Sequence, residues 1–316
     1  MPTPFITPAY LRQSGLGVSW SSFPKQGASA EESLAAQLDA CWYATSTMAM
    51  EASQELRASI TTEQDYGPDR TITILPNLFG RYQLSRWPVL SIVSAQWSGA
   101  TLPATWQSIA TQYLSTETSY LAPYGSIVGD GAGQGPNAVL VAPGFVSWWG
   151  GRKGTLLQVT YLNGWPTCGI DQSAAAGATS IHVDDITGWW NGTAGARGTI
   201  YDPPWREDVT VTGAPTPDVS GATSGPGTLP VSALQFPHAP TEASTTTPNL
   251  TVLLTTMPRS LLQAGLFFAS YYALLRGSQA AVMQTAGGQK LSGSGAVDAW
   301  YDRGKKIIAH YARVQF

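Results

Sequence analysis

The sequence predicts an α+β fold, with a helical core made of a long N-terminal helix and two C-terminal helices, a small β-sheet and an inserted all-β subdomain. Apolar residues recur at helical spacing near both ends of the chain, and period-two alternation marks the segments between them. Residues 170–240 are short strand-like runs separated by Gly, Pro and Asp turns. The 316 residues, 43% of them hydrophobic, are enough for a sizeable core.

The first predicted helix covers about residues 30–57. Ser29 and Glu32 form a capping-box pattern at its start. Apolar residues then follow at helical spacing, at Leu34, Leu38, Cys41, Trp42, Met48, Ala49, Ala52 and Leu56. Residues 1–28 are rich in Pro, Gly and Ser, so they form an extended N-terminal arm that either docks on another surface or stays a disordered tail.

Strands are predicted from residue 60 onward. The alternation runs through residues 60–64, 71–75, 82–87, 87–97 and 156–164. Residues 98–154 are broken by Gly and Pro, which indicates a long excursion carrying short strands. The short strands of residues 170–240 predict a compact all-β insertion.

Two helices complete the predicted core. Pro258 suits the first position of a helix that reaches about Gly277, and residues 296–311 have an amphipathic pattern. The expected domains are therefore an arm at 1–28, a core formed by 29–169 and 241–316, and a β subdomain at 170–240.

Charge and composition exclude several classes of protein. The net charge of −3, with only 12% charged residues, argues against a protein that grips nucleic acid by neutralising phosphates. A surface so poor in charge suits a protein that neighbours cover. No signal-peptide pattern opens the chain and no apolar run reaches about 18 residues, so we expect neither secretion nor a membrane span. Cys41 and Cys168 are expected to be reduced thiols in a cytoplasmic setting.

The sequence offers no pattern of catalytic, cofactor-binding or metal-ligating residues. His182, His238 and His310 lie in separate segments without metal-ligand spacing, which indicates surface histidines. The acidic runs at 184–185 and 206–208 are interpreted as solvated turn charges. The sequence thus predicts a protein that is not an enzyme and binds no cofactor.

Two strand motifs stand between the predicted helices. The first is Trp87-Pro88-Val89-Leu90-Ser91-Ile92-Val93-Ser94-Ala95, and the second is Leu157-Gln158-Val159-Thr160-Tyr161-Leu162-Asn163-Gly164. A helix precedes them, and a proline-started helix and a last amphipathic helix with a basic, aromatic end follow. This order resembles the head-to-tail connector (adaptor) family of siphophages.

The resemblance implies a structural virion protein that forms a ring, twelve-fold in many relatives, beneath the portal and links the DNA-filled capsid to the tail. Its partners would be further copies of itself, the portal protein and a downstream connector, stopper or tail terminator protein. Genomic DNA would pass through the channel without specific binding, and no membrane would be involved. The protein would assemble in the host cytoplasm and reside at the head–tail interface of the virion.

The resemblance also nominates contact residues, because the final segment of the family often packs into the portal. Basic and aromatic side chains interleave there, and strong interfaces use both kinds. The portal-interaction candidates are Arg303, Lys305, Lys306, Tyr311, Arg313 and Phe316.

Two tryptophan pairs leave an alternative open. Trp148, Trp149, Trp189 and Trp190 would contact neighbouring subunits or partners in a ring. If they are exposed, they could instead stack on sugar rings. The chain would then be a tail-associated carbohydrate-binding β module.

Overall fold

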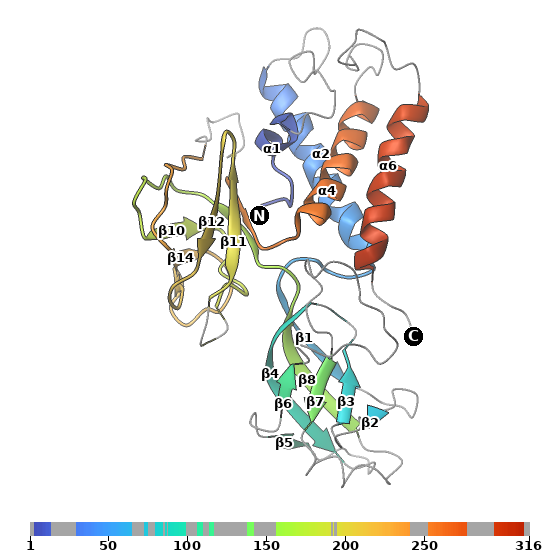
Figure 1. Cartoon of the computed structure of the whole chain (residues 1–316), viewed down its shortest axis with the longest axis vertical. Coiled ribbons are helices and arrows are strands. Elements are labelled where there is room, and N and C mark those ends of the chain that lie inside the picture. The colour runs from blue at the N-terminus through green and yellow to red at the C-terminus, as the bar shows by residue number, and fades with distance from the viewer. Residues whose placement is uncertain are drawn as a thin grey trace. The chain divides into compact units, whose positions relative to one another are not determined.

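The chain divides into two compact units, which are described separately. The first unit comprises residues 1–56 and 166–312, and the second comprises residues 57–165 and 313–316. The computed structural model in Figure 1 describes residues 3–13, 30–64, 73–74, 80–84, 86, 88–98, 106–109, 114–116, 138–141, 156–190, 192, 195–240, 252–276 and 294–312.

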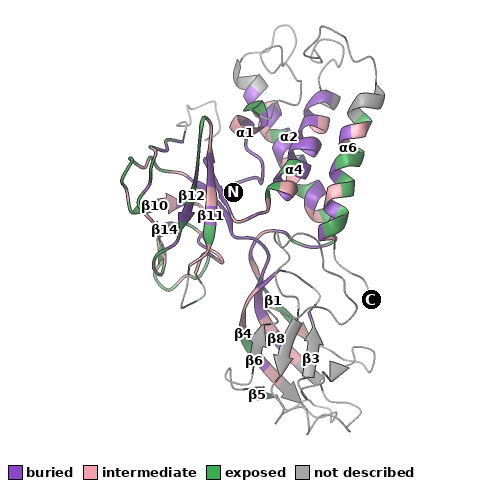
Figure 2. Cartoon of the chain, viewed as in Figure 1, coloured by how far each residue is buried: buried purple, intermediate pink, exposed green. Residues whose placement is uncertain are grey.

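The helices belong to the first unit. They are α1 (Pro8–Gln13), α2 (Ala30–Glu51), α4 (Arg259–Arg276) and α6 (Ser294–Ile308), the last followed by the 3-10 turn η3 (Ala309–Tyr311). Helix α4 packs against both α2 and α6, and its side chains are buried along most of its length (Figure 2). Its two neighbours each bury one face, as expected of amphipathic helices in a layer.

Helix α2 ends at a Schellman motif. The main-chain N–H of Gln54 donates to the carbonyl of Ala49, and the N–H of Ser53 donates to the carbonyl of Met50. Ser53 adopts the left-handed conformation that this motif requires, with φ 54°. A serine therefore occupies a position that favours glycine.

The largest sheet has seven strands, in the order β12-β11-β15-β9-β10-β14-β13, and also belongs to the first unit. Its neighbouring strands run antiparallel. In chain order they are β9 (Thr167–Ile170), β10 (Ser180–Val183), β11 (Arg197–Asp202), β12 (Trp205–Thr210), β13 (Thr216–Pro217), β14 (Gly227–Pro230) and β15 (Val252–Thr255).

This sheet closes on itself. Residue Val211, directly after β12, pairs with Val231, directly after β14. Two main-chain hydrogen bonds flank that bridge, from Thr212 to the carbonyl of Pro230 and from Ser232 to the carbonyl of Thr210. Strands β12, β11, β15, β9, β10 and β14 thus form a closed barrel.

The barrel encloses one apolar core. Trp189 is its largest fully buried side chain and packs among the branched residues that the strands point inward. Gly198 of β11 makes room for it, since a Cβ at that position would lie 2.8 Å from the indole ring. The core consists of Cys168, Ile170, Ile181, Val183, Ile186, Trp189, Ile200, Val209, Val211, Leu229, Val231, Leu234, Val252 and Leu254.

The N-terminal segment packs within the first unit. Phe5, Ile6 and Leu11 are fully buried. The main-chain N–H of Phe5 donates to the hydroxyl of Thr45 in α2, and a Cβ at Gly265 of α4 would lie 2.7 Å from Ile6. Residues 3–11 are therefore part of the core of this unit.

The second unit contains two four-stranded antiparallel sheets, ordered β1-β8-β4-β5 and β2-β3-β7-β6. Asn163 of β8 bridges to β1 through its side-chain amide, which donates to the carbonyl of Ser59 and to the hydroxyl of Thr61. The strands are β1 (Ser59–Gln64), β2 (Thr73–Ile74), β3 (Gly80–Gln83), β4 (Val89–Ser98), β5 (Gln107–Ile109), β6 (Leu114–Thr116), β7 (Ala138–Val141) and β8 (Leu156–Asn163).

The expectation of a helical core with a small sheet is wrong. The described residues are mostly strands, in antiparallel sheets of seven, four and four strands, with only a few helices. The physical reason lies in short buried strands such as β9 and β15. Each has four residues, all of them buried, so neither carries the alternation that reveals a strand. Both pair inside the barrel with strands far away in sequence.

Candidate functional site

The basic residues proposed at the C-terminal end lie on the exposed face of α6. Arg303, Lys305 and Lys306 are exposed. The Nζ of Lys305 lies 3.2 Å from Oε1 of Glu51 in α2 and 5.6 Å from the centre of the Tyr301 ring. Arg303 and Lys306 thus present charge to solvent, while Lys305 ties α6 to α2.

Tyr311 has a place inside the first unit. Its side chain is buried, and its hydroxyl lies 2.6 Å from the hydroxyl of Ser260 in α4. Its carbonyl accepts a hydrogen bond from the side-chain amide of Gln54. These contacts join the end of the last helix to α4 and to the residues after α2. Arg313 and Phe316 lie outside the described residues.

The tryptophan candidates have different surroundings. Trp189 is 0% exposed in the barrel core, and its indole N–H has no hydrogen-bond partner among the described residues. Trp190 is half-buried and packs against the same core. Trp189 therefore packs inside its own subunit, where it can neither contact a neighbour nor stack on a sugar. Trp148 and Trp149 lie outside the described residues.

A row of tyrosines crosses the helix layer. Consecutive ring centres lie 5.6 Å apart between Tyr43 and Tyr272, 5.2 Å between Tyr272 and Tyr271, and 5.0 Å between Tyr271 and Tyr301. These rings come from α2, α4 and α6, and we call the four residues the tyrosine row. Burial and the nearby Glu51 carboxylate, which accepts from the Tyr301 hydroxyl, raise the pKa of Tyr301 to about 12.

Helix α2 carries a second exposed apolar side chain beyond the tyrosine row. Tyr43 is 49% exposed and Met50, two turns further along the same face, is 65% exposed. Large apolar side chains and tyrosines of this kind are enriched in protein–protein interfaces. This surface is the candidate assembly surface of the helix layer.

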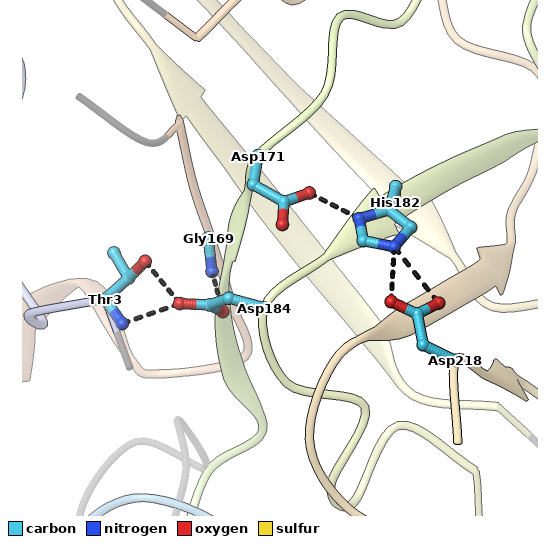
Figure 3. Close-up of polar contacts among 6 residues, drawn as sticks. All are labelled: Thr3, Gly169, Asp171, His182, Asp184 and Asp218. Atoms are coloured by element: carbon cyan, nitrogen blue, oxygen red, sulfur yellow. Dashed lines mark hydrogen bonds and ion pairs between the residues drawn. The ribbon is translucent and has the colours of Figure 1, made fainter. Parts of the chain in front are cut away.

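Two ionic clusters lie in the barrel part of the first unit, each centred on a histidine. In the first, Nδ1 of His182 lies 2.5 Å from Asp171, and Nε2 lies 3.1 Å from Asp218 (Figure 3). Each carboxylate meets a different nitrogen of the ring. They come from the residue after β9 and the residue after β13, so the cluster ties three segments together.

The second cluster is more deeply buried. His238 is 0% exposed, with Nδ1 3.0 Å from Asp202 of β11 and Nε2 3.0 Å from Glu207 of β12. The second oxygen of Glu207 accepts a hydrogen bond from the main-chain N–H of Gln235. The cluster thus joins the β11–β12 hairpin to the segment that follows β14. The surface position expected for His238 and the solvated position expected for Glu207 are wrong.

The carboxylates determine the protonation of both histidines. Burial by itself lowers the pKa of His182 and of His238, but the hydrogen bonds and negative charge of two carboxylates outweigh it in each case. The net result is a raised pKa for both rings. A doubly paired imidazolium uses both of its nitrogens, so neither ring has a nitrogen left to accept a proton from a substrate.

The geometry of these clusters does not favour a metal either. Ligands of one ion must converge on a single point, whereas the two carboxylates of each cluster contact different nitrogens of the imidazole. In the described part of the chain, no group of three or more His, Cys, Asp or Glu side chains could hold a metal ion. Both clusters are therefore suited to fixing the positions of strands and loops.

A third carboxylate fastens the N-terminal segment to the barrel. One oxygen of Asp184 accepts hydrogen bonds of 2.7 Å from both the N–H and the hydroxyl of Thr3, and the other accepts from the N–H of Gly169 (Figure 3). Asp184 was expected to be a solvated turn charge. Its position next to the end of β10 instead connects residue 3 with β9.

No protein-family model, no curated protein and no solved structure matches the chain. None of the helices in the described ranges is long and apolar enough to cross a membrane.

Proposed function

We propose that the chain is a head-to-tail connector, or adaptor, of a long-tailed bacteriophage, which forms a ring beneath the portal and links the capsid to the tail. Its partners are further copies of itself, twelve per ring in the pattern of the family it resembles, the portal protein, and a downstream connector, stopper or tail terminator protein. Genomic DNA passes through without specific binding. The protein acts as a structural component at the head–tail interface, without catalysis, and assembles in the host cytoplasm.

The observation that carries the proposal is the assembly surface formed by the tyrosine row and Met50. A tyrosine surface continuous over three helices provides rigid aromatic area at low entropic cost, which is typical of interfaces. In a ring, this surface of each subunit contacts a different surface of its neighbour. The rotation that relates successive subunits then brings the last subunit into contact with the first. The low share of charged residues supports the same interpretation.

The exposed charges of α6 support a contact with the portal. Arg303 and Lys306 face solvent near the C-terminal end of the helix. Such charges steer association with an acidic partner and fix its orientation. Lys305 contributes less to the portal contact, because its charge already pairs with Glu51.

The ring can be tested with two surface variants. The double variant Tyr43→Ser with Met50→Ser removes the two large exposed apolar side chains of α2. The control is Val219→Ser, which removes a strongly exposed apolar side chain between β13 and β14. Native mass spectrometry of each protein with purified portal should give rings for the wild type and for Val219→Ser, and dissociated subunits for the double variant. A double variant that assembles normally would contradict the role of this surface.

The portal contact can be tested by charge reversal. Arg303→Glu with Lys306→Glu should abolish binding to the portal while the protein stays folded, because both side chains are exposed. Truncation of the chain after residue 302 is a poorer test, since it also removes the buried side chains of Ile308 and Tyr311. Electron microscopy of a strain without the protein decides the function as a whole: tailed, DNA-filled particles would refute it.

A further inference from the structure

The tip of the β11–β12 hairpin carries an exposed aromatic pair. Trp205 is 42% exposed, and its ring stacks on that of Phe236, with the centres 4.6 Å apart and the planes 11° from parallel. The phenyl ring covers one face of the indole and holds it in a fixed plane. The rest of the indole forms a flat apolar surface in solvent.

The buried His238 cluster fixes the hairpin side of this pair. Asp202 precedes Trp205 by three residues and Glu207 follows it by two, and both carboxylates lie 3.0 Å from His238. The hairpin is therefore held on both sides of the indole. Buried ionic groups are costly unless all of them are paired, so the buried His238 and Glu207, with the partly buried Asp202, mark a position that is rigidly defined.

The same cluster fixes the Phe236 side. Gln235 donates its main-chain N–H to Glu207 over 2.7 Å, and His238 follows Phe236 by two residues. Main-chain hydrogen bonds in both directions between His238 and Ala174 anchor the segment further. Both rings of the pair are thus preorganised by one buried cluster, as a binding site requires.

The polar groups around the pair indicate the chemistry of a ligand. Gln235, the residue before Phe236, is exposed, and its side-chain amide can both donate and accept hydrogen bonds. The net charge of −3 disfavours a polyanion such as nucleic acid. A ligand with a flat apolar face and hydroxyl groups at its rim matches both features, and a neutral sugar ring has this form.

We propose that Trp205 and Phe236 form a platform that binds a neutral pyranose ring of an oligosaccharide, with His238 as the positioning residue beneath it. Trp205 is a different residue from the four tryptophans that the sequence pointed to. The platform is independent of ring assembly, so either proposal can fail while the other holds.

The platform responds to pH through the cluster. The charged groups that act on His238 are Asp202 of β11 and Glu207 of β12, and the segment at Ala174 meets it through the main chain. Loss of the proton leaves the ring with one donor for two carboxylates. Sugar binding should therefore weaken as the pH rises through the raised pKa of His238.

The test uses the complete chain and a panel of neutral oligosaccharides made of glucose, mannose, galactose or N-acetylglucosamine units. At least one of them should bind, and Trp205→Ala should weaken that binding by about tenfold or more, while Trp205→Phe, which keeps a ring, should retain part of it. Val219→Ala, an exposed apolar residue of the same unit, is the control and should bind normally. Absence of binding by the wild type, or equal binding by Trp205→Ala, would overturn the proposal.

A second variant tests the positioning role. His238→Gln cannot be an imidazolium, so it should bind the same oligosaccharide more weakly and without the pH dependence of the wild type. Circular dichroism identifies any sample that is unfolded, and those samples are replaced by Phe236→Ala, which removes the stacking partner alone. Specific binding of Trp205 to a proline-rich peptide, with no affinity for sugars, would also refute the sugar platform.

Discussion

Nε2 of His238 lies 3.0 Å from Oε1 of Glu207, and both side chains are buried in the barrel part of the first unit. Asp202 binds the other nitrogen of the same ring. Removing one member of a buried ionic cluster leaves the others without compensation, and this penalty usually exceeds the gain from the intact pair.

We therefore expect His238→Gln to lower the free energy of unfolding by about 3 kcal/mol, because an amide cannot satisfy two carboxylates. Chemical denaturation monitored by near-ultraviolet circular dichroism measures the loss. His310→Gln alters an exposed histidine and should stay within about 0.5 kcal/mol of the wild type. Similar losses for both variants would show that the cluster contributes little.

The two histidine clusters predict that stability depends on pH. Each imidazole has a folded-state pKa above the unfolded value of 6.5, so its contribution is fully present below pH 6.5 and is lost as the pH rises through the folded pKa. The melting temperature should consequently fall as the pH rises above 6.5 and through the folded-state pKa values. Scanning calorimetry from about pH 6 to about pH 9 measures this slope. The double variant His182→Asn with His238→Gln should show a flatter profile, and an unchanged slope would be inconsistent with the clusters as its source.

Ser53 predicts a stabilising substitution. Its left-handed backbone, φ 54°, disfavours any residue with a Cβ, and its side chain is exposed. Ser53→Gly should raise the free energy of unfolding by about 0.5–1 kcal/mol, as measured by thermal or chemical unfolding. Ser53→Ala keeps the Cβ and serves as the control. If the glycine variant is no more stable than the alanine variant, backbone strain at this position is negligible.

Gly265 and Ile6 should show energetic coupling. A Cβ on Gly265 would lie 2.7 Å from Cγ1 of Ile6 and 2.8 Å from the sulfur of Met48. Gly265→Ala should therefore destabilise the protein by about 1–3 kcal/mol through overpacking. Ile6→Ala removes the clashing atoms of residue 6 and leaves only the sulfur of Met48, so the double variant should lose clearly less than the sum of the single losses. A double-mutant cycle by chemical denaturation measures the difference, and strict additivity would mean that residue 6 does not pack there.

The sequence predicted the individual elements better than the fold class. Helix α4 and strands β4 and β8 stand where the helical or alternating patterns were clear. The barrel could not be anticipated, because it is completed by β9 and β15, two four-residue strands without alternation. Each of these strands pairs with strands far away in the sequence, and the local periodicity of a segment does not indicate such distant partners.

The ionic clusters were missed for a similar reason. His238 meets Asp202 and Glu207 across 36 and 31 residues, distances at which no spacing motif applies. One signal was present in β12, where Glu207 shares the inward face with Val209. An acidic residue on the buried face of a strand predicts a buried partner, and a histidine or basic residue is the natural one.

The bridge between Val211 and Val231 has a consequence when many copies of the chain are crowded together. Strands with unpaired main-chain groups recruit other strands, and at high local concentration they cause aggregation. At this bridge, main-chain hydrogen bonds from Thr212 to Pro230 and from Ser232 to Thr210 use groups of both strands, and β13 covers the beginning of β14. Where the barrel is closed in this way, crowded copies can contact one another through side chains, which evolution can alter one residue at a time.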